Sequence, residues 1–150
     1  MQPYRKTDAL MQELVDQVFH TPRHRVRRAL EVGDDDALTV TAFTLVEELA
    51  DLTGLPKTQI YTIVGTSQPT SSRERRAGTL APVDVADRAL QVTELFARVV
   101  AVLGRDKARA WIVRPNGHLD GKAPVDLMRT STGRDRLARY LDSLEDVTYG

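Results

Sequence analysis

Polar and cationic side chains are concentrated in the short segment 68–76, which follows the turn Gly65-Thr66-Ser67. Glutamine and arginine can hydrogen-bond the edges of DNA bases, serine and threonine reach bases or phosphates, and arginine neutralises phosphate. A three-arginine cluster is also typical of an ordinary solvated helix face, so spacing alone leaves both interpretations open. If the segment is the DNA-contacting helix of a helix-turn-helix, its candidate residues are Gln68, Thr70, Ser71, Ser72, Arg73, Arg75 and Arg76.

A second helix-turn-helix register competes with this one. It would turn at Gly54 and place the helix over 57–64 in the major groove of DNA. That helix offers one cation, Lys57, and several residues that its spacing predicts to be buried. We therefore favour the later register, in which 68–76 contacts DNA. Since a specific site usually needs two modules on two half-sites, a homodimer is implied if operator DNA is a partner.

The chain lacks the residue patterns from which enzymes build a reactive centre. It has no cysteine, no GxSxG, no glycine-rich phosphate loop and no HExxH. His20 and His24 have a metal-like spacing, but Pro22 lies between them and no third ligand is evident. The acidic residues 34–36 lack the alternating ligands of a calcium loop. We expect no enzymatic activity, no cofactor and no metal site.

The composition is that of a folded protein of the cytoplasm. Of the 150 residues, 41% are hydrophobic and 28% are charged, and 21 Lys and Arg balance 21 Asp and Glu. Any nucleic-acid surface must therefore be a local patch. Because no apolar run approaches the roughly 18 residues of a membrane span, and no signal-peptide core is present near the start, we expect no membrane contact.

Apolar residues recur at spacings of three and four along most of the chain, which predicts a mainly α fold. The expected helices cover 8–19, 41–53, 55–64, 67–76, 82–103, 106–113 and 125–128, and a last helix begins at a Thr132 cap with Asp135 three positions later. On that last helix Arg134, Arg136 and Arg139 are predicted to face outward. Residues 146–150 are expected to form a short tail.

Three parts of the chain can be separated by composition. Residues 1–36 are expected to be an N-terminal extension whose order depends on partners, because a basic run with four arginines and an acidic loop follow its single helix. Residues 37–80 contain the helix-turn-helix, and residues 81–150 form a small helical C-terminal domain with a tail. The helix over 82–103 has an apolar face wide enough to pack against both halves.

An ordered set of motifs occupies the second half of the chain: Ala108, Ala110, Trp111-Ile112, Pro115-Asn116, Leu119, Gly121, Pro124-Val125-Asp126-Leu127, Thr130, Gly133, Leu137 and Leu141. In this order and spacing they resemble the toxin-binding domain of Xre/MbcA/ParS-type antitoxins. The upstream residues Gly54-Leu55, Gly65-Thr66-Ser67, Thr70, Arg73 and Leu80 resemble the Xre-like helix-turn-helix that precedes it. The resemblance covers about residues 40–145 and supports the later register.

The resemblance implies a type II antitoxin that is paired with a RES-domain toxin and that represses their shared operon through its DNA-binding half. The toxin would consume NAD or transfer ADP-ribose from it, by phosphorolysis, hydrolysis or protein ADP-ribosylation. A hetero-oligomer of toxin and antitoxin is then expected. The alternative is a free-standing transcriptional regulator whose C-terminal half serves dimerisation or ligand sensing.

Under this resemblance the acidic C-terminus offers a means of inhibition. A dinucleotide cleft needs cations for the pyrophosphate, and carboxylates can pair with the same cations. We expect the last helix to dock on the toxin and 146–150 to occlude its NAD entrance, against the simpler interpretation of a frayed terminus. The candidate toxin-binding residues are Glu145, Asp146, Tyr149 as a ring for a pocket, the terminal carboxylate of Gly150, and Arg136 and Arg139, whose simpler role is a solvated face.

Overall fold

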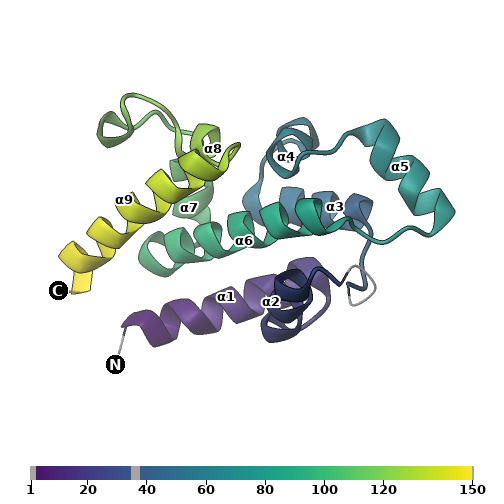
Figure 1. The fold of residues 1–150 in the computed structure, drawn as a ribbon. Helices are drawn as coiled ribbons and strands as arrows, with labels where there is room; N and C mark the ends of the chain where they lie inside the picture. Colours follow the sequence, from purple (N-terminus) through teal and green to yellow (C-terminus); the bar gives the residue numbers. More distant parts are fainter. Residues whose placement is uncertain (1–2, 35–37, 150) are drawn as a thin grey trace.

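The computed structural model describes residues 3–34 and 38–149, and within these ranges the chain forms nine α-helices, one short 3-10 helix and no strand (Figure 1). The mainly α fold is thereby confirmed. The elements are α1 (Pro3–Phe19), α2 (Arg23–Val32), α3 (Ala42–Thr53), α4 (Lys57–Val64), α5 (Gln68–Ala77), α6 (Val83–Leu103), α7 (Arg105–Ile112), the 3-10 helix η2 (Gly117–Leu119), α8 (Pro124–Leu127) and α9 (Ser131–Tyr149).

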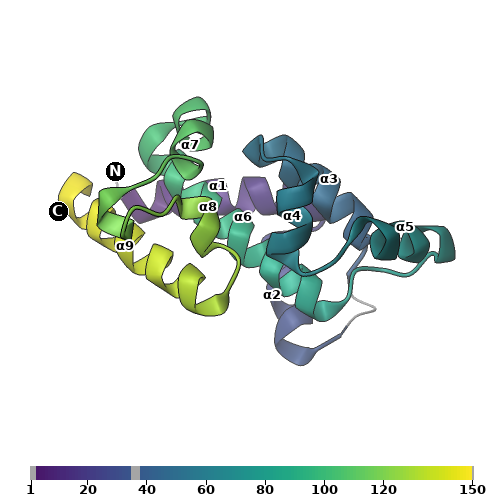
Figure 2. The ribbon, with the colours of Figure 1, turned by 90° about the horizontal axis from the view of Figure 1, so that it is seen from above.

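Helix α6 is the scaffold on which the other helices assemble. It crosses the middle of the molecule, with α3, α4 and α5 toward one end and α7, α8 and α9 toward the other (Figures 1 and 2). Most of its length is buried, because apolar residues cover more than one of its faces. Buried side chains from Leu14 to Leu141 form one continuous cluster, so the two halves share a core across the predicted division at 80/81.

The N-terminal segment differs from the expectation that its order depends on a partner. Helix α1 lies along α6, and α2 folds back against both. The side chains of Leu14, Val15 and Val18 on α1 are fully buried, and Val26 on α2 is almost so. Burial of these apolar side chains stabilises α1 and α2 without a partner protein, so both helices are part of the core.

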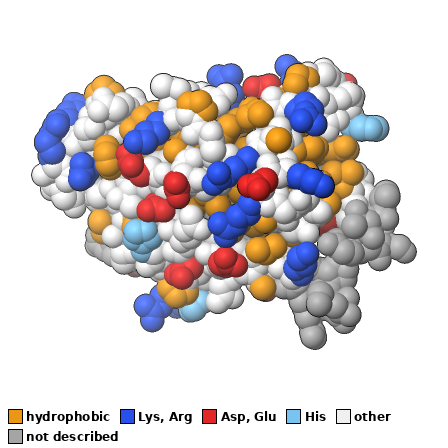
Figure 3. All heavy atoms as spheres, turned by 180° about the vertical axis from the view of Figure 1, so that it is seen from behind, with side chains coloured by type: hydrophobic (Ala, Val, Ile, Leu, Met, Phe, Trp, Pro, Cys, Tyr) orange, Lys and Arg blue, Asp and Glu red, His pale blue; other side chains and the backbone are white. Residues whose placement is uncertain are grey.

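Charges of both signs lie side by side across one face of the molecule (Figure 3). Many surface cations have a carboxylate partner: Arg105 pairs with Glu13 at 3.2 Å, and Lys57 pairs with Glu47. Such exposed pairs add little stability. They do, however, neutralise the cations that take part in them.

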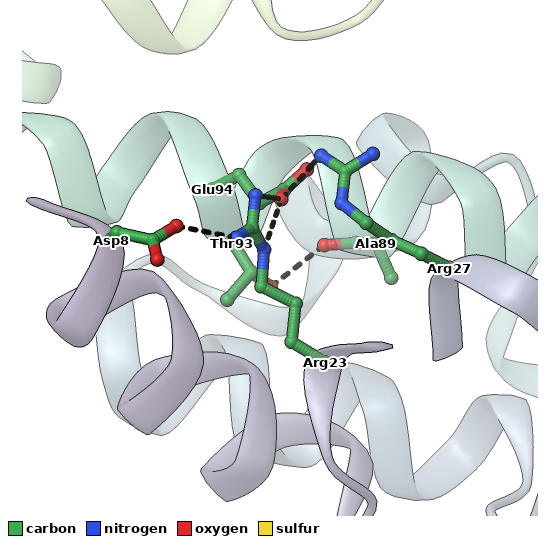
Figure 4. A network of polar contacts seen from close by, with 6 residues as sticks. All are labelled: Asp8, Arg23, Arg27, Ala89, Thr93 and Glu94. Atoms are coloured by element: carbon green, nitrogen blue, oxygen red, sulfur yellow. Dashed lines mark hydrogen bonds and ion pairs between the residues drawn. The ribbon is translucent and has the colours of Figure 1, made fainter. Parts of the chain in front are cut away.

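One charged cluster is built around a buried carboxylate, and it joins the N-terminal helices to α6 (Figure 4). Glu94 of α6 is 8% exposed, and its carboxylate accepts hydrogen bonds from Arg23 at 2.6 Å and from Arg27 at 2.6 and 2.7 Å. Arg23 also donates to Asp8 of α1 at 2.9 Å. The basic run of the sequence is therefore divided: Arg23 and Arg27 turn toward α6, while its other two arginines are exposed.

The last helix begins and ends at residues other than those predicted. Its cap is Thr130 and not Thr132, since the Thr130 hydroxyl accepts the backbone N–H of Gly133 at 2.9 Å. The helix continues to Tyr149, so 146–149 is helical backbone and not a tail. Arg134, predicted to face outward, is 7% exposed. It donates to Gln91 at 2.7 Å and to the Met128 carbonyl at 3.0 Å, which holds α9 against α6 and α8.

Candidate functional site

The turn between α4 and α5 lies at residues 65–67, where the later register predicts a turn. Gly65 ends α4 with a φ of +77°, a left-handed conformation that glycine adopts without steric cost. Ser67 then caps α5 by accepting the backbone N–H of Thr70 at 3.2 Å.

Exposed cations distinguish α5 from α4. On α4 the only Lys or Arg is Lys57, which is paired with Glu47, a contact that raises its pKa. On α5 the side chains of Gln68, Arg73, Arg75 and Arg76 are exposed, whereas Thr70 and Ser72 are half-buried. Within the described residues none of these three arginines forms an ion pair, so they are available to a phosphate.

Several α5 side chains are held by local contacts. Arg75 lies over the ring of Phe43 with its guanidinium carbon 4.5 Å from the ring centroid, a cation–π arrangement that holds its guanidinium against α3. Arg73 donates to Thr70, and Gln68 donates to Ser72 at 3.0 Å. The helix therefore presents an ordered polar face with cations along its outer side.

Ser71 is a correction to the predicted DNA-contacting set. Ser71 is fully buried, and its hydroxyl lies 3.2 Å from the Gln68 carbonyl and 3.4 Å from the Tyr61 hydroxyl. A buried hydroxyl cannot reach a phosphate while α5 remains packed. Ser71 belongs to the inner face of α5, and the other six predicted residues lie wholly or partly at the surface.

A compact helical unit lies at the other end of α6. Asn116 caps η2 and pairs with Lys122 in an isolated bridge, which closes the loop between α7 and α8. Trp111 of α7 stacks on Tyr140 of α9 with centroids 6.3 Å apart, and His118 stacks on Tyr140 at 5.8 Å. These contacts join α7, η2 and α9 around a set of rings.

Close approach of α8 and α9 depends on Gly133. A Cβ added there would overlap the Leu127 carbonyl oxygen and lie 2.9 Å from the Leu127 carbonyl carbon. The glycine thus lets the backbone of α9 pass directly against the end of α8, a reason for its presence that spacing does not show.

The acidic end of α9 is tied to α6 by a residue that the sequence did not single out. Arg98 donates to Glu145 at 2.9 Å and to Asp142 at 2.5 Å. Burial lowers the pKa of Arg98, but the hydrogen bonds to these two carboxylates outweigh it and raise the pKa above its ordinary value. Glu145, predicted to pair with a cation of the toxin, therefore already has a cation partner within the chain.

The remaining predicted toxin-binding residues are spread along α9. Asp146 is exposed, and Arg139 is exposed with no ion pair in the described part of the chain. Arg136 pairs with Asp120 of the loop after η2 at 2.9 Å. The side chain of Tyr149 and the whole of Gly150 lie outside the described residues.

Two kinds of feature are absent from the described ranges. No helix there is both long and apolar enough to cross a bilayer. In the same ranges no three acidic or histidine side chains come together as a metal site.

Comparison with known proteins assigns the C-terminal unit. Residues 98–146 match the family model described as the antitoxin Xre/MbcA/ParS C-terminal toxin-binding domain. The match begins at Arg98, near the end of α6, and ends at Asp146, so it covers α7, η2, α8 and most of α9. No curated protein matches the chain. Residues 98–146 are therefore similar to an antitoxin Xre/MbcA/ParS C-terminal toxin-binding domain, and this match supports an antitoxin role for the chain in a toxin–antitoxin pair.

Proposed function

We propose that this antitoxin neutralises a RES-domain toxin, which consumes NAD or transfers ADP-ribose from it, and that it represses the shared operon by binding DNA through α5. The observation that carries the proposal is the family match of residues 98–146 to a toxin-binding domain. The organisation would follow the sequence-based division: a DNA-binding part over 37–80 and a toxin-binding part over 81–150. Helices α1 and α2 pack against α6 beside these two parts.

The end of α9 is the element that we propose to enter the toxin's NAD pocket. The last carbonyls of a helix carry about half a negative charge, and Asp146 adds an exposed carboxylate near that end. A pocket that binds a pyrophosphate presents cations, and these would attract both the last carbonyls of α9 and the Asp146 carboxylate. In this mechanism Arg98 positions the end of α9 through Glu145 and Asp142, instead of leaving these groups free.

Growth rescue tests the toxin role. Cells that express the RES-domain protein encoded beside this chain should be rescued by the full chain and not by a chain that lacks residues 146–150. Circular dichroism should show that the shortened chain keeps its helices. Asp146→Asn should weaken rescue, whereas the matched control Asp16→Asn, at an exposed site on α1, should not. Full rescue by the shortened chain would refute the occlusion mechanism, and no rescue by the full chain would refute the toxin assignment.

The proposed DNA role rests on the exposed and unpaired arginines of α5. Each phosphate contact contributes about 0.9 to the slope of log affinity against log salt concentration. Arg73→Ala and Arg76→Ala should each lower that slope by about 0.9 when binding to the operon's own promoter is measured. The control Arg105→Ala changes the first residue of α7, a helix in the other half of the molecule from α5 (Figure 2), and should leave the slope unchanged. Unchanged slopes in both α5 variants would mean that α5 does not face DNA.

A further inference from the structure

An apolar groove lies on the surface of the toxin-binding unit, between the end of α6, α7 and α9. Its volume is 190 Å³. Val99 and Leu141 form its buried floor, and the side chains around them are partly exposed. It is lined by Val99, Val102, Leu103, Trp111, Tyr140, Leu141 and Leu144.

The chemistry of this groove suits apolar side chains. Every side chain in its lining is aliphatic or aromatic, and the Trp111 and Tyr140 rings are held nearly parallel, 5° apart. A groove with rigid aromatic walls can accept an aliphatic or aromatic side chain without losing much side-chain entropy of its own. Central apolar pockets of this kind carry much of the binding energy of protein interfaces.

Two observations favour the toxin as the occupant. All seven lining residues fall within 98–146, the segment that matches a toxin-binding domain. Leu144 also lies one residue before Glu145 and two before Asp146, so a toxin seated over the end of α9 would cover the groove. The hollow between α4 and α8 is different, since polar residues, including Thr58, Gln59, Asp126 and Arg129, take part in its lining.

We propose that the toxin inserts one or two apolar side chains into this groove, and that this contact holds the antitoxin in place while the end of α9 blocks the NAD pocket. The inference rests on the proposed function and adds to it the surface that supplies the affinity. It assigns to Trp111 and Tyr140 a role in toxin recognition beside their packing role.

Trp111 allows a direct test, because it is the single tryptophan of the chain. The full chain is labelled with 5-fluorotryptophan and titrated with the purified, unlabelled RES-domain protein encoded beside it. The chemical shift of the single fluorine resonance should change saturably as the complex forms, because broadening alone follows from the larger size of any complex. If size-exclusion chromatography shows a complex while the chemical shift does not change, the groove is not the toxin contact, although the antitoxin role stands. If no complex forms, both proposals fall.

A pair of variants provides a second test. Val102→Glu places a charge at the partly exposed rim of the groove, and Val32→Glu places the same charge on α2, where the side chain is 67% exposed. We expect the toxin Kd to rise at least about 30-fold for the first variant and less than about twofold for the second. Equal affinities for two folded variants would overturn the inference. Should Val102→Glu fail to fold in a thermal scan, the fluorine titration decides alone.

Discussion

Removal of the Glu94 carboxylate should loosen the N-terminal helices from the rest of the protein. In Glu94→Ala the charges of Arg23 and Arg27 lose the group that holds them against α6 (Figure 4). Arg23 keeps Asp8 as a partner, at 2.9 Å, whereas Arg27 keeps none among the described residues. The variant therefore creates a poorly compensated cation at the junction of α1, α2 and α6.

The expected cost follows from the exposure of the partners. Breaking a fully buried ion pair by removing one member costs about 3–5 kcal/mol. Here the Glu94 side chain is 11% exposed, but Arg27 is 47% exposed and can be partly resolvated by water. We therefore expect a loss of about 2–3 kcal/mol in the free energy of unfolding, which lowers Tm by roughly 5–10 °C for a chain of this size.

Urea unfolding followed by circular dichroism measures this loss directly. The control is Glu13→Ala, which removes an exposed carboxylate of α1 that pairs with Arg105 and should change the free energy of unfolding by less than about 0.5 kcal/mol. Hydrogen exchange should accelerate in α1 and α2 of the Glu94 variant. If Glu94→Ala is as stable as Glu13→Ala, the cluster does not hold these helices, and the description of them as part of the core is wrong.

Three further predictions test other contacts. Gly133→Ala should lower the free energy of unfolding by at least about 2 kcal/mol, because its Cβ would overlap the Leu127 carbonyl, whereas Gly78→Ala, with open space around it, should cost about 1 kcal/mol. Ser71→Ala should change DNA affinity less than about twofold, since its hydroxyl is buried; a larger loss in binding assays would place it at the DNA. Arg98→Ala should speed hydrogen exchange at the end of α9; unchanged exchange would show that its ion pairs do not order that end.

The helices other than α2 were predictable, most of them from an apolar stripe at helical spacing and from the glycine, proline or capping residue at their ends; α5 was predictable from the residues at its ends alone. The packing of α1 and α2 was not, because it depends on contacts with α6 between residues far apart in the chain, among them the contact of Arg23 with Glu94, 71 residues away. A run of arginines near a terminus is typical of an exposed segment. Only the three-dimensional structure shows that Arg23 and Arg27 face the Glu94 carboxylate on a mostly buried helix.

The candidate sites were predictable in position and less so in detail. The exposed cations of α5 lie in the segment where the pattern of polar residues predicted them. Ser71, in the first turns of the same helix, is buried and faces the core. The acidic end was expected as a tail, because residues 146–150 offer few apolar contacts. In the structure α9 continues to Tyr149, and Arg98 pairs with Asp142 and Glu145 in the turn before this end.

The most direct test of the antitoxin assignment is a titration of toxin activity. NAD consumption by the purified RES-domain protein encoded beside this chain is measured while the full chain is added. We predict that consumption falls to zero at a fixed molar ratio of the two proteins, because each toxin pocket is blocked by one α9 end. Consumption that stays constant in a large molar excess of the chain would contradict the account.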